Sequence, residues 1–344
     1  MQKTVFVVDD SDTNLATAEE ALDNQYRVMT LPSASKMFSL LEKVTPDLIL
    51  LDIEMPEIDG FEALRRLKSN DEHADIPVIF LTSMTDATVE ANGFQLGVID
   101  FITKPFSAPV LINRIKTHLD IDELIRERTA RLQQLQNAIV FGFADIVESR
   151  DNETGGHVER TSEYIRILLN ALLERGLYID EIRELDIESL VSSARLHDVG
   201  KVAITDIILN KPGKLTQDEF EVMKLHPSEG EKIIDHIALR TDNGEFLENA
   251  KLFAGYHHER WDGTGYPYGL KGTEIPLQGR IMAIVDVYDA LVSARPYKRA
   301  FSEDEALAII MDSAGKHFDP VIAEVFMENK DQMNAVRKKL AAGL

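Results

Sequence analysis

The first 118 residues alternate short apolar runs with amphipathic segments, and this alternation restricts the possible folds more than any other feature of the chain. The apolar runs are Thr4–Val8, Arg27–Leu31, Asp47–Leu51, Pro77–Leu81 and Val98–Thr103. Between the second and third runs, Met37, Leu40, Leu41 and Val44 repeat at helical spacing. Strands that alternate with helices predict a parallel α/β sheet of five strands, with ligands gathered at the carboxyl ends of the strands.

Charged and hydroxyl side chains stand where these predicted strands end. Asp9 and Asp10 follow the first run, and Asp52 follows Leu51 of the third. Three carboxylates that converge on one edge of a sheet repel each other unless a cation joins them, and hard oxygen ligands suit Mg²⁺. Lys104 follows the fifth run. The pattern therefore favours a magnesium site at this edge of the sheet.

Residues 1–118 resemble the receiver domain of response regulators, with a flavodoxin-like fold. The resemblance implies that Asp52 is the phospho-acceptor and that Asp9 and Asp10 hold Mg²⁺. The other implied functional positions are Thr82 and Lys104, which contact the phosphoryl group, and Phe101 at the aromatic switch position. A sensor histidine kinase would be the partner. A receiver-like fold that no longer accepts phosphate is the alternative, but every reactive position is filled.

Residues 119–144 are expected to form a connecting helix. No proline interrupts them, and their apolar side chains fall on a stripe with a spacing of about 3.5 residues that is broken by Arg128. The stripe consists of Ile121, Ile125, Leu132, Leu135 and Ile139. Such a helix can pair with its copy in a homodimer. A helix packed on its own domain explains the stripe equally well.

Residues 145–344 have an almost wholly helical pattern and predict an all-α domain. Thr216 with Glu219, and Ser302 with Glu305, form capping boxes, and His226 is expected to end the helix that Thr216 begins. In an all-α domain, a site must be built from side chains on facing helices.

Adjacent His257 and His258, followed by a glycine-rich segment, are the first sign of such a site. Two polar rings are costly to bury unless something accepts their lone pairs, and a metal ion does so. The chain has no cysteine, so imidazole and carboxylate groups are the available metal ligands. An exposed loop with two solvated histidines would be the simpler explanation for an isolated His-His pair.

The motif His197-Asp198-Val199-Gly200-Lys201, together with Gly265-Tyr266-Pro267, resembles the HD-GYP branch of the HD metal-dependent phosphohydrolases over roughly residues 140–330. The metal ligands that the resemblance implies are Glu153, His157, His197, Asp198, His226, His257, His258 and Asp286. They would hold two or three divalent metals, with Fe or Mn favoured and Ni, Co or Zn also suited to such ligands.

The resemblance also implies roles in the reaction. Asp198 would bridge two metals that activate water for attack on phosphorus, and Lys201 would reach the scissile phosphate. Arg295 and Lys298 would form a fork for phosphate, although a solvated charge pair is the simpler explanation. Gly265-Tyr266-Pro267 is expected to be a rigid loop that shapes the substrate pocket and offers a contact to partner proteins.

Glu153 is surplus to a dinuclear site, so we expect it to hold a third metal with His157. A burial of this extra carboxylate without a cation would be costly. The competing interpretation is that Glu153 caps the helix that begins near Thr154, or faces water.

The expected function is therefore that of a response regulator whose output domain opens cyclic di-GMP to the linear dinucleotide, with further cleavage to GMP left open. Phosphorylation of Asp52 would control this activity. One alternative is a phosphodiesterase for another cyclic dinucleotide, such as cyclic GMP-AMP. The other is a catalytically silent module that signals through the Gly-Tyr-Pro loop.

The charge balance fits a small anionic substrate better than a polymer. The 37 Lys and Arg residues against 59 Asp and Glu give a net charge of −22, which repels nucleic acid. Bound divalent cations can invert the field locally. No apolar run approaches the roughly 20 residues of a membrane span, so we expect a cytoplasmic protein without membrane insertion.

Overall fold

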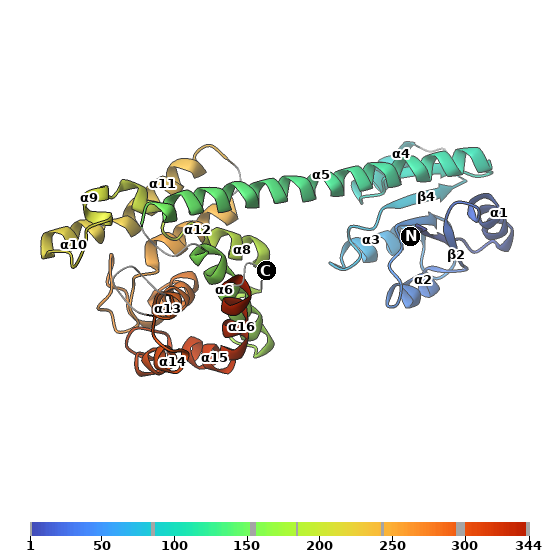
Figure 1. The fold of residues 1–344 in the computed structure, drawn as a ribbon. Helices are drawn as coiled ribbons and strands as arrows, with labels where there is room; N and C mark the ends of the chain where they lie inside the picture. Colours follow the sequence, from blue (N-terminus) through green and yellow to red (C-terminus); the bar gives the residue numbers. More distant parts are fainter. Residues whose placement is uncertain are drawn as a thin grey trace. The chain divides into compact units, whose positions relative to one another are not determined.

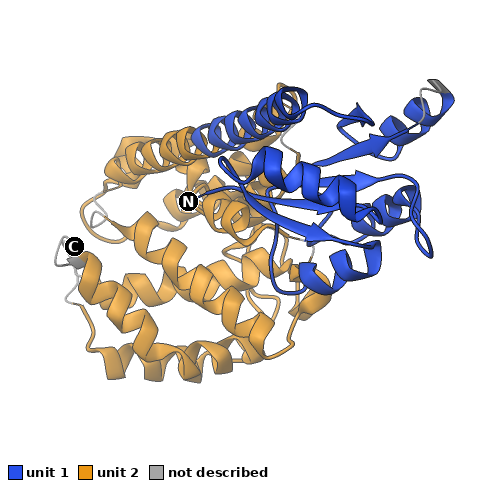
Figure 2. Ribbon diagram, turned by 90° about the vertical axis from the view of Figure 1, so that its right-hand side faces the viewer, with its two compact units in different colours: residues 1–132 blue, residues 133–344 orange. Residues whose placement is uncertain are grey.

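The computed structural model describes residues 2–83, 87–151, 156–183, 185–241, 244–293 and 300–341. The chain divides into two compact units, Met1–Leu132 and Gln133–Leu344 (Figure 2).

The first unit contains the expected five-stranded parallel sheet. The strands are β1 (Thr4–Val8), β2 (Arg27–Leu31), β3 (Leu48–Asp52), β4 (Val78–Thr82) and β5 (Asp100–Thr103), in the order β2-β1-β3-β4-β5. The helices between them are α1 (Asp12–Leu22), α2 (Ala34–Leu41), α3 (Gly60–Lys68) and α4 (Ala87–Gln95). The third, fourth and fifth strands each begin one or two residues later than the apolar runs suggested. The α/β prediction is confirmed.

Both faces of this sheet are covered, which explains why its three central strands, β1, β3 and β4, are almost continuously apolar. Phe6, Ile49 and Phe80 pack in one cluster with side chains of α2 and α3, whereas Val7 and Leu50 pack in another with α1 and the start of the helix that follows β5 along the chain, α5 (Ala108–Ser149). The strand register places Asp52 opposite Leu81 and Thr82 opposite Thr103, so the polar strand ends meet at one edge.

Helix α5 (Ala108–Ser149) is longer at both ends than the predicted segment 119–144 (Figure 1). Its first turns contribute Leu111 and Ile115 to the core of the first unit, so the helix already begins there. The apolar stripe is exposed: 59% of Ile125 and 66% of Leu132 is accessible. Ile125 also lines a cavity with Thr45 and Ile76 of the first unit. Pairing of the stripe with a second copy therefore stays a prediction.

The second unit is helical, as predicted. After α5 its elements are α6 (His157–Glu174), α7 (Ile179–Ile182), α8 (Ile187–Ala194), the 3-10 turn η1 (Val199–Ala203), α9 (Asp206–Leu209), α10 (Gln217–Met223), α11 (His226–Ala238), α12 (Gly244–Tyr256), the 3-10 turn η2 (Gly272–Glu274), α13 (Leu277–Val292), α14 (Glu303–Asp312), α15 (Pro320–Glu328) and α16 (Lys330–Ala341). None of the helices in the described part of the chain combines the length and apolar character that a membrane span requires.

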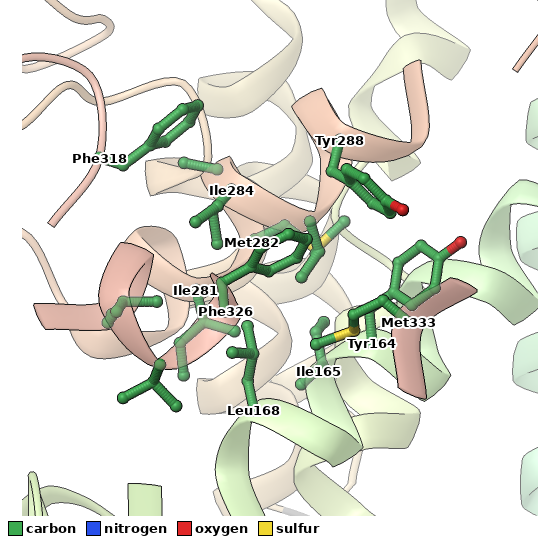
Figure 3. Close-up of a cluster of buried hydrophobic side chains, with 14 of the residues drawn as sticks. Tyr164, Ile165, Leu168, Ile281, Met282, Ile284, Tyr288, Phe318, Phe326 and Met333 are labelled. Atoms are coloured by element: carbon green, nitrogen blue, oxygen red, sulfur yellow. The ribbon is translucent and has the colours of Figure 1, made fainter. Parts of the chain in front are cut away.

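Helix α13 lies in the core of this unit. Met282 and Tyr288 on α13 pack with Tyr164 of α6 and Phe326 of α15 in one buried cluster (Figure 3). This helix is buried on most sides, and it therefore fixes the position of any polar side chain that it carries.

One local prediction is wrong. The capping box at Thr216 is present, but the helix that it starts ends at Met223, and His226 begins α11 instead. Pro227 explains the change, since proline is tolerated in the first turn of a helix but not in its interior.

Candidate functional site

The second unit brings seven of the eight predicted metal ligands to one place, and each comes from the end or the buried face of an element. They are His157 at the start of α6, His197 and Asp198 between α8 and η1, His226 at the start of α11, His257 and His258 after α12, and Asp286 within α13.

The ligand atoms form two groups. In the first, His157, His197 and Asp286 each offer one atom, and these atoms lie within 4.8 Å of one another. In the second, His226 and His257 are joined by His258 with the same spacing. Each group has the number of protein ligands that a metal ion with open positions requires.

Asp198 lies between the two groups. Its Oδ2 is 3.3 Å from Nε2 of His197 in the first group. Its Oδ1 is 3.4 Å from Nε2 of His226 and 3.7 Å from Nε2 of His257 in the second group. One carboxylate thus presents a different oxygen to each group, which is the geometry of a bridging ligand.

Backbone carbonyls determine which ring nitrogen of three histidines carries the proton. Nδ1 lies 3.1 Å from the Ala194 carbonyl oxygen in His197, 2.8 Å from that of Met223 in His226, and 3.0 Å from that of Ala254 in His257. A carbonyl oxygen can only accept, so each Nδ1 donates and each Nε2 keeps its lone pair. The three Nε2 atoms are therefore the available ligand atoms.

This arrangement fits bound cations. The Nε2 atoms of His226 and His257 are 3.3 Å apart, and two lone pairs at that distance repel each other unless a cation lies beside them. Within the described part of the chain, Nε2 of His197 and Oδ1 of Asp198 are buried and form no hydrogen bond. Buried polar atoms without hydrogen bonds are costly, and metal coordination would satisfy them.

The protonation states also suit metal ligands, which must be deprotonated. Burial lowers the pKa of His226 to about 3, and burial with the adjacent His257 lowers the pKa of His258 well below its ordinary value. Burial alone would raise the pKa of Asp198, but the adjacent Lys201 ammonium holds it well below its usual range.

Asp289 is a functional residue that the sequence analysis missed. It is buried, and its Oδ2 lies 2.9 Å from Nδ1 of His157. Arg160 donates to both of its oxygens, at 2.7 and 2.9 Å. A carboxylate on the far nitrogen of a ligand histidine fixes the orientation of the ring. The available signal was a carboxylate three residues after Asp286, among apolar residues of α13.

Lys201 lies at the same centre. Its Nζ is 2.9 Å from Oδ2 of Asp198 and 2.5 Å from Oδ2 of Asp151, a second residue that the sequence analysis missed. Lys201 and Asp151 both line a cavity of about 440 Å³, within the size range of small-molecule pockets. The cavity wall also includes His226, His258, Tyr266 and Asp286.

The Gly265-Tyr266-Pro267 segment contributes to this wall. The Tyr266 ring stacks on His258, with ring centroids 4.8 Å apart. A Cβ at Gly265 would lie 2.4 Å from the Arg260 nitrogen, so only glycine allows this close approach. The buried Glu259 carboxylate accepts the backbone N–H groups of residues 268, 269 and 270, which holds the loop that follows.

Three predicted site residues lie outside the described residues. They are Glu153, Arg295 and Lys298.

The predicted receiver residues meet at the polar edge of the sheet. Carboxylate oxygens of Asp9, Asp10 and Asp52 lie within 4.8 Å of one another. The Lys104 Nζ is 2.6 Å from Oδ2 of Asp9 and 2.7 Å from Oδ2 of Asp52. The sequence analysis missed Asn14, whose amide donates to both oxygens of Asp9. Three clustered carboxylates with one ammonium fit a bound Mg²⁺.

The two remaining receiver positions lie beside this cluster. Thr82 is buried at the end of β4 and pairs with Thr103, the residue before Lys104. Phe101 packs edge-on against Phe80 and Phe94, with centroids 5.6 and 5.1 Å apart.

Comparisons with known proteins match both units. A family model described as HD domain matches residues 143–322, and one described as response regulator receiver domain matches residues 5–116. A probable cyclic di-GMP phosphodiesterase of Vibrio cholerae is 39% identical over 99% of this chain and 80% of its own.

Two further relatives are also named as phosphodiesterases of cyclic dinucleotides. The cyclic di-GMP phosphodiesterase response regulator RpfG of Xanthomonas campestris is 36% identical over 96% of this chain and 89% of its own. The 3'3'-cGAMP-specific phosphodiesterase 2 of Vibrio cholerae is 38% identical over 61% of this chain and 38% of its own.

Proposed function

This chain belongs to the response regulators of the cyclic di-GMP phosphodiesterase family, which join a receiver domain to an HD domain, and we propose that its own helical unit hydrolyses cyclic di-GMP at a metal centre. The observation that carries this proposal is the position of Asp198, which faces both groups of ligand atoms. The product is the linear dinucleotide, and a second cut would yield GMP.

The residues of the site have distinct tasks. His157, His197 and Asp286 would hold one ion and His226, His257 and His258 the other, with Asp198 between the two groups as a shared ligand. When bound, the metals supply Lewis acidity and lower the pKa of water. Lys201 is placed beside Asp198 to neutralise a phosphoryl oxygen of the substrate. Arg295 and Lys298 orient the phosphates, and Tyr266 closes one wall of the pocket.

The nature of the ligands supports transition metals in the helical unit. Mixed imidazole and carboxylate ligation without sulfur suits Fe, Mn, Ni, Co or Zn, and the resemblance to the family favours Fe or Mn. In the receiver, where all three ligands are carboxylates, Mg²⁺ is favoured.

The number of transition metals depends on Glu153. A third ion would take Glu153 as a ligand beside His157. Anomalous scattering from metal-replete crystals should then show three peaks, and Glu153→Gln should remove one of them. Two peaks at full occupancy in the unmodified protein would establish a dinuclear centre.

We place the receiver domain at residues 1–118, the connecting segment at 119–144 and the phosphodiesterase domain at 145–344. A cognate histidine kinase phosphorylates Asp52, and α5 carries the change to the output domain, since it is continuous from Ala108 to Ser149. Its exposed stripe pairs with a second copy. A charge at Leu132 should disrupt this dimer in light scattering, and an unmodified protein that is monomeric in both phosphorylation states would contradict the pairing.

A phosphodiesterase for 3'3'-cGAMP is the second candidate, because a relative of that name matches 61% of this chain. The described pocket residues do not include a set that reads base edges. A silent interaction module is disfavoured, since the seven described ligand positions are all retained.

The decisive experiment measures metal content and turnover together. The purified protein is assayed for bound metal and then offered cyclic di-GMP and 3'3'-cGAMP separately, with products resolved by chromatography. We expect bound transition metal and a higher kcat/KM for cyclic di-GMP. A higher kcat/KM for 3'3'-cGAMP would select the second candidate, and metal without turnover of either would refute the enzymatic proposal.

A further inference from the structure

The last turn of α5 and the residues after it contact both halves of the metal centre. Glu148, Arg150 and Asp151 each bond to a segment that carries a functional side chain, whereas the exposed Ser149 donates to the Ile146 carbonyl oxygen of its own helix. We propose that Glu148 and Arg150 are positioning residues, which set the place of His157 and of Lys201 respectively. This inference rests on the proposed metal-dependent activity and specifies how α5 acts on that site.

Glu148 acts as the missing N-terminal cap of α6. The residue before that helix is Gly156, in a left-handed conformation with a φ of 85°, and it provides no side-chain cap. The Glu148 carboxylate accepts the backbone N–H of His157 at 3.2 Å and that of Val158 at 3.4 Å. The first N–H groups of a helix need such acceptors, and a negative charge there is favourable.

His157, whose N–H is capped, is itself a proposed metal ligand. The cap therefore fixes the backbone position from which the His157 ring extends. Asp289 orients that ring from the far side, through Nδ1. Glu148 is buried and held against α6, so this end of α5 cannot shift without moving the N-terminus of α6. His157 is therefore located from two directions, by α13 through its ring and by α5 through its backbone.

Arg150 holds the other half of the site. Its guanidinium donates to the carbonyl oxygen of Val202 at 3.3 Å and to that of Ile204 at 3.2 Å, and it pairs with Asp206 at 2.7 Å. These carbonyls lie at the end of η1, the turn that carries Lys201. A cation is favourable at such a terminus, where carbonyl groups lack partners within the turn.

The position of η1 matters because it packs directly on a ligand segment. A Cβ at Gly200 would lie 1.8 Å from the carbonyl oxygen of His226, so η1 and the start of α11 touch through their backbones. Lys201 follows Gly200 and extends to Asp198 and Asp151. Loss of the Arg150 clamp should therefore loosen Lys201 more than it disturbs the histidines.

Glu148 lies in the last turn of α5 and Arg150 directly follows that helix. The first turns of α5 contribute Leu111 and Ile115 to the core of the receiver unit. A twist of α5 would reach His157 through Glu148 and Lys201 through Arg150. Metal affinity and substrate binding can thus be changed by one helix through two separate contacts.

The Glu148 contact is tested by Mn²⁺ titration of the full-length protein after removal of bound metal. Glu148→Ala should weaken one class of Mn²⁺ site by about tenfold or more, by analogy with other outer-sphere partners of ligands. Glu148→Gln, which keeps the shape and one acceptor oxygen, should show a smaller loss. The matched control is Asp145→Asn on the exposed face one turn earlier, which should bind Mn²⁺ like the unmodified protein.

The Arg150 contact is tested by kinetics and hydrogen exchange. Arg150→Ala should raise KM for cyclic di-GMP several-fold with metal content unchanged, and the backbone amides of residues 201–204 should exchange faster. Ser149→Ala in the same turn is the control and should change neither quantity.

Equal Mn²⁺ affinity in Glu148→Gln, Glu148→Ala and Asp145→Asn would overturn the Glu148 assignment. If Glu148→Ala does not fold, as judged by circular dichroism, the Glu148→Gln titration alone decides. Unchanged KM and unchanged exchange in Arg150→Ala would overturn the Arg150 assignment. The titration and the exchange need no turnover, so an unmodified protein that binds Mn²⁺ without cleaving either dinucleotide would refute the proposed function while leaving these tests valid.

Discussion

The receiver and the helical unit each gather side chains that could hold an ion, but from different atoms and by different routes. In the receiver, Asp9 and Asp52 leave the ends of neighbouring parallel strands, and Lys104 bridges their carboxylates. In the helical unit the ligands come from helix ends and from the buried face of α13, and His157 is separated from its partner Asp289 by 132 residues. The parallel sheet brings the receiver side chains together, whereas the packing of many helices brings the side chains of the other site together.

Burial shifts the pKa values of side chains in the two sites in opposite directions. It raises the pKa of Asp52, reinforced by Asp9 and opposed by Lys104, and it lowers the pKa of His226 to about 3. In both cases burial disfavours the charged form. For a histidine the neutral form is the metal ligand, so burial prepares the helical site. For a carboxylate the charged form is the ligand and the nucleophile, so the receiver needs Lys104 or a cation to offset burial.

The largest expected effect comes from substituting a central carboxylate in each site in turn and measuring the activity of both sites. Asp198→Ala should remove the ligand that faces both groups, with a loss of metal affinity and turnover of at least about 100-fold, more than for an outer-sphere partner. Phosphorylation of Asp52 by a small phosphodonor with Mg²⁺ should persist in that variant. Asp52→Ala should show the reverse pattern. Turnover in Asp198→Ala with the site emptied would break the distinction between the two sites.

A smaller effect is expected from loss of the carboxylate that supports a ligand imidazole from outside the site. Asp289→Asn keeps its size but weakens the bonds to His157 and Arg160, and should lower metal affinity by roughly 10- to 100-fold. The measurement is metal titration, with the exposed Asp312→Asn as control. If both variants retain normal affinity, Asp289 does not orient His157.

The phosphate fork should affect substrate and not metal. Arg295→Ala removes a charge-assisted contact worth about 1.5–3 kcal/mol, or roughly ten- to a hundredfold in substrate affinity. Metal content should remain that of the unmodified protein, because guanidinium is not a ligand. Unchanged KM and kcat would assign Arg295 to the solvated surface.

The smallest expected effect comes from the raised pKa of Asp52 in the receiver. Because the pKa of Asp52 is raised in the folded state, the folded protein binds this proton more tightly than the unfolded chain does. The stability that this proton contributes is present at low pH and lost as pH rises through the folded pKa. In metal-free buffer at pH 7, the receiver unit of the Asp52→Asn variant should therefore have a melting temperature a few degrees higher than that of the unmodified protein.

The control for this measurement is the exposed Asp71→Asn, which should leave the melting temperature unchanged. The difference between Asp52→Asn and the unmodified protein should shrink as the pH is lowered towards the ordinary carboxyl range. A lower melting temperature for Asp52→Asn at pH 7 would mean that its pairing with Lys104 outweighs burial.

Local patterns in the sequence were sufficient for much of this architecture. The apolar runs predict the strands because a parallel sheet buried on both faces requires them, and Asp9 and Asp52 then converge because parallel strands end at one edge. The capping box at Thr216 also follows from neighbouring residues. The seven described metal ligands were identified by resemblance of motifs, and their spacing alone would not have grouped them.

Other features depend on contacts between distant segments. No local pattern states that Glu148 caps α6, that Arg150 closes η1, or that carbonyls of Ala194, Met223 and Ala254 set the protonation of three imidazoles. His226 was assigned to the wrong helix for the same reason, since its place is set by Pro227 and by the packing of η1 on α11. The sequence by itself determined the elements and the chemistry available to the site. Only the tertiary structure decided which oxygen meets which nitrogen, because hydrogen bonds and metal ligation depend on positions within a few tenths of an ångström.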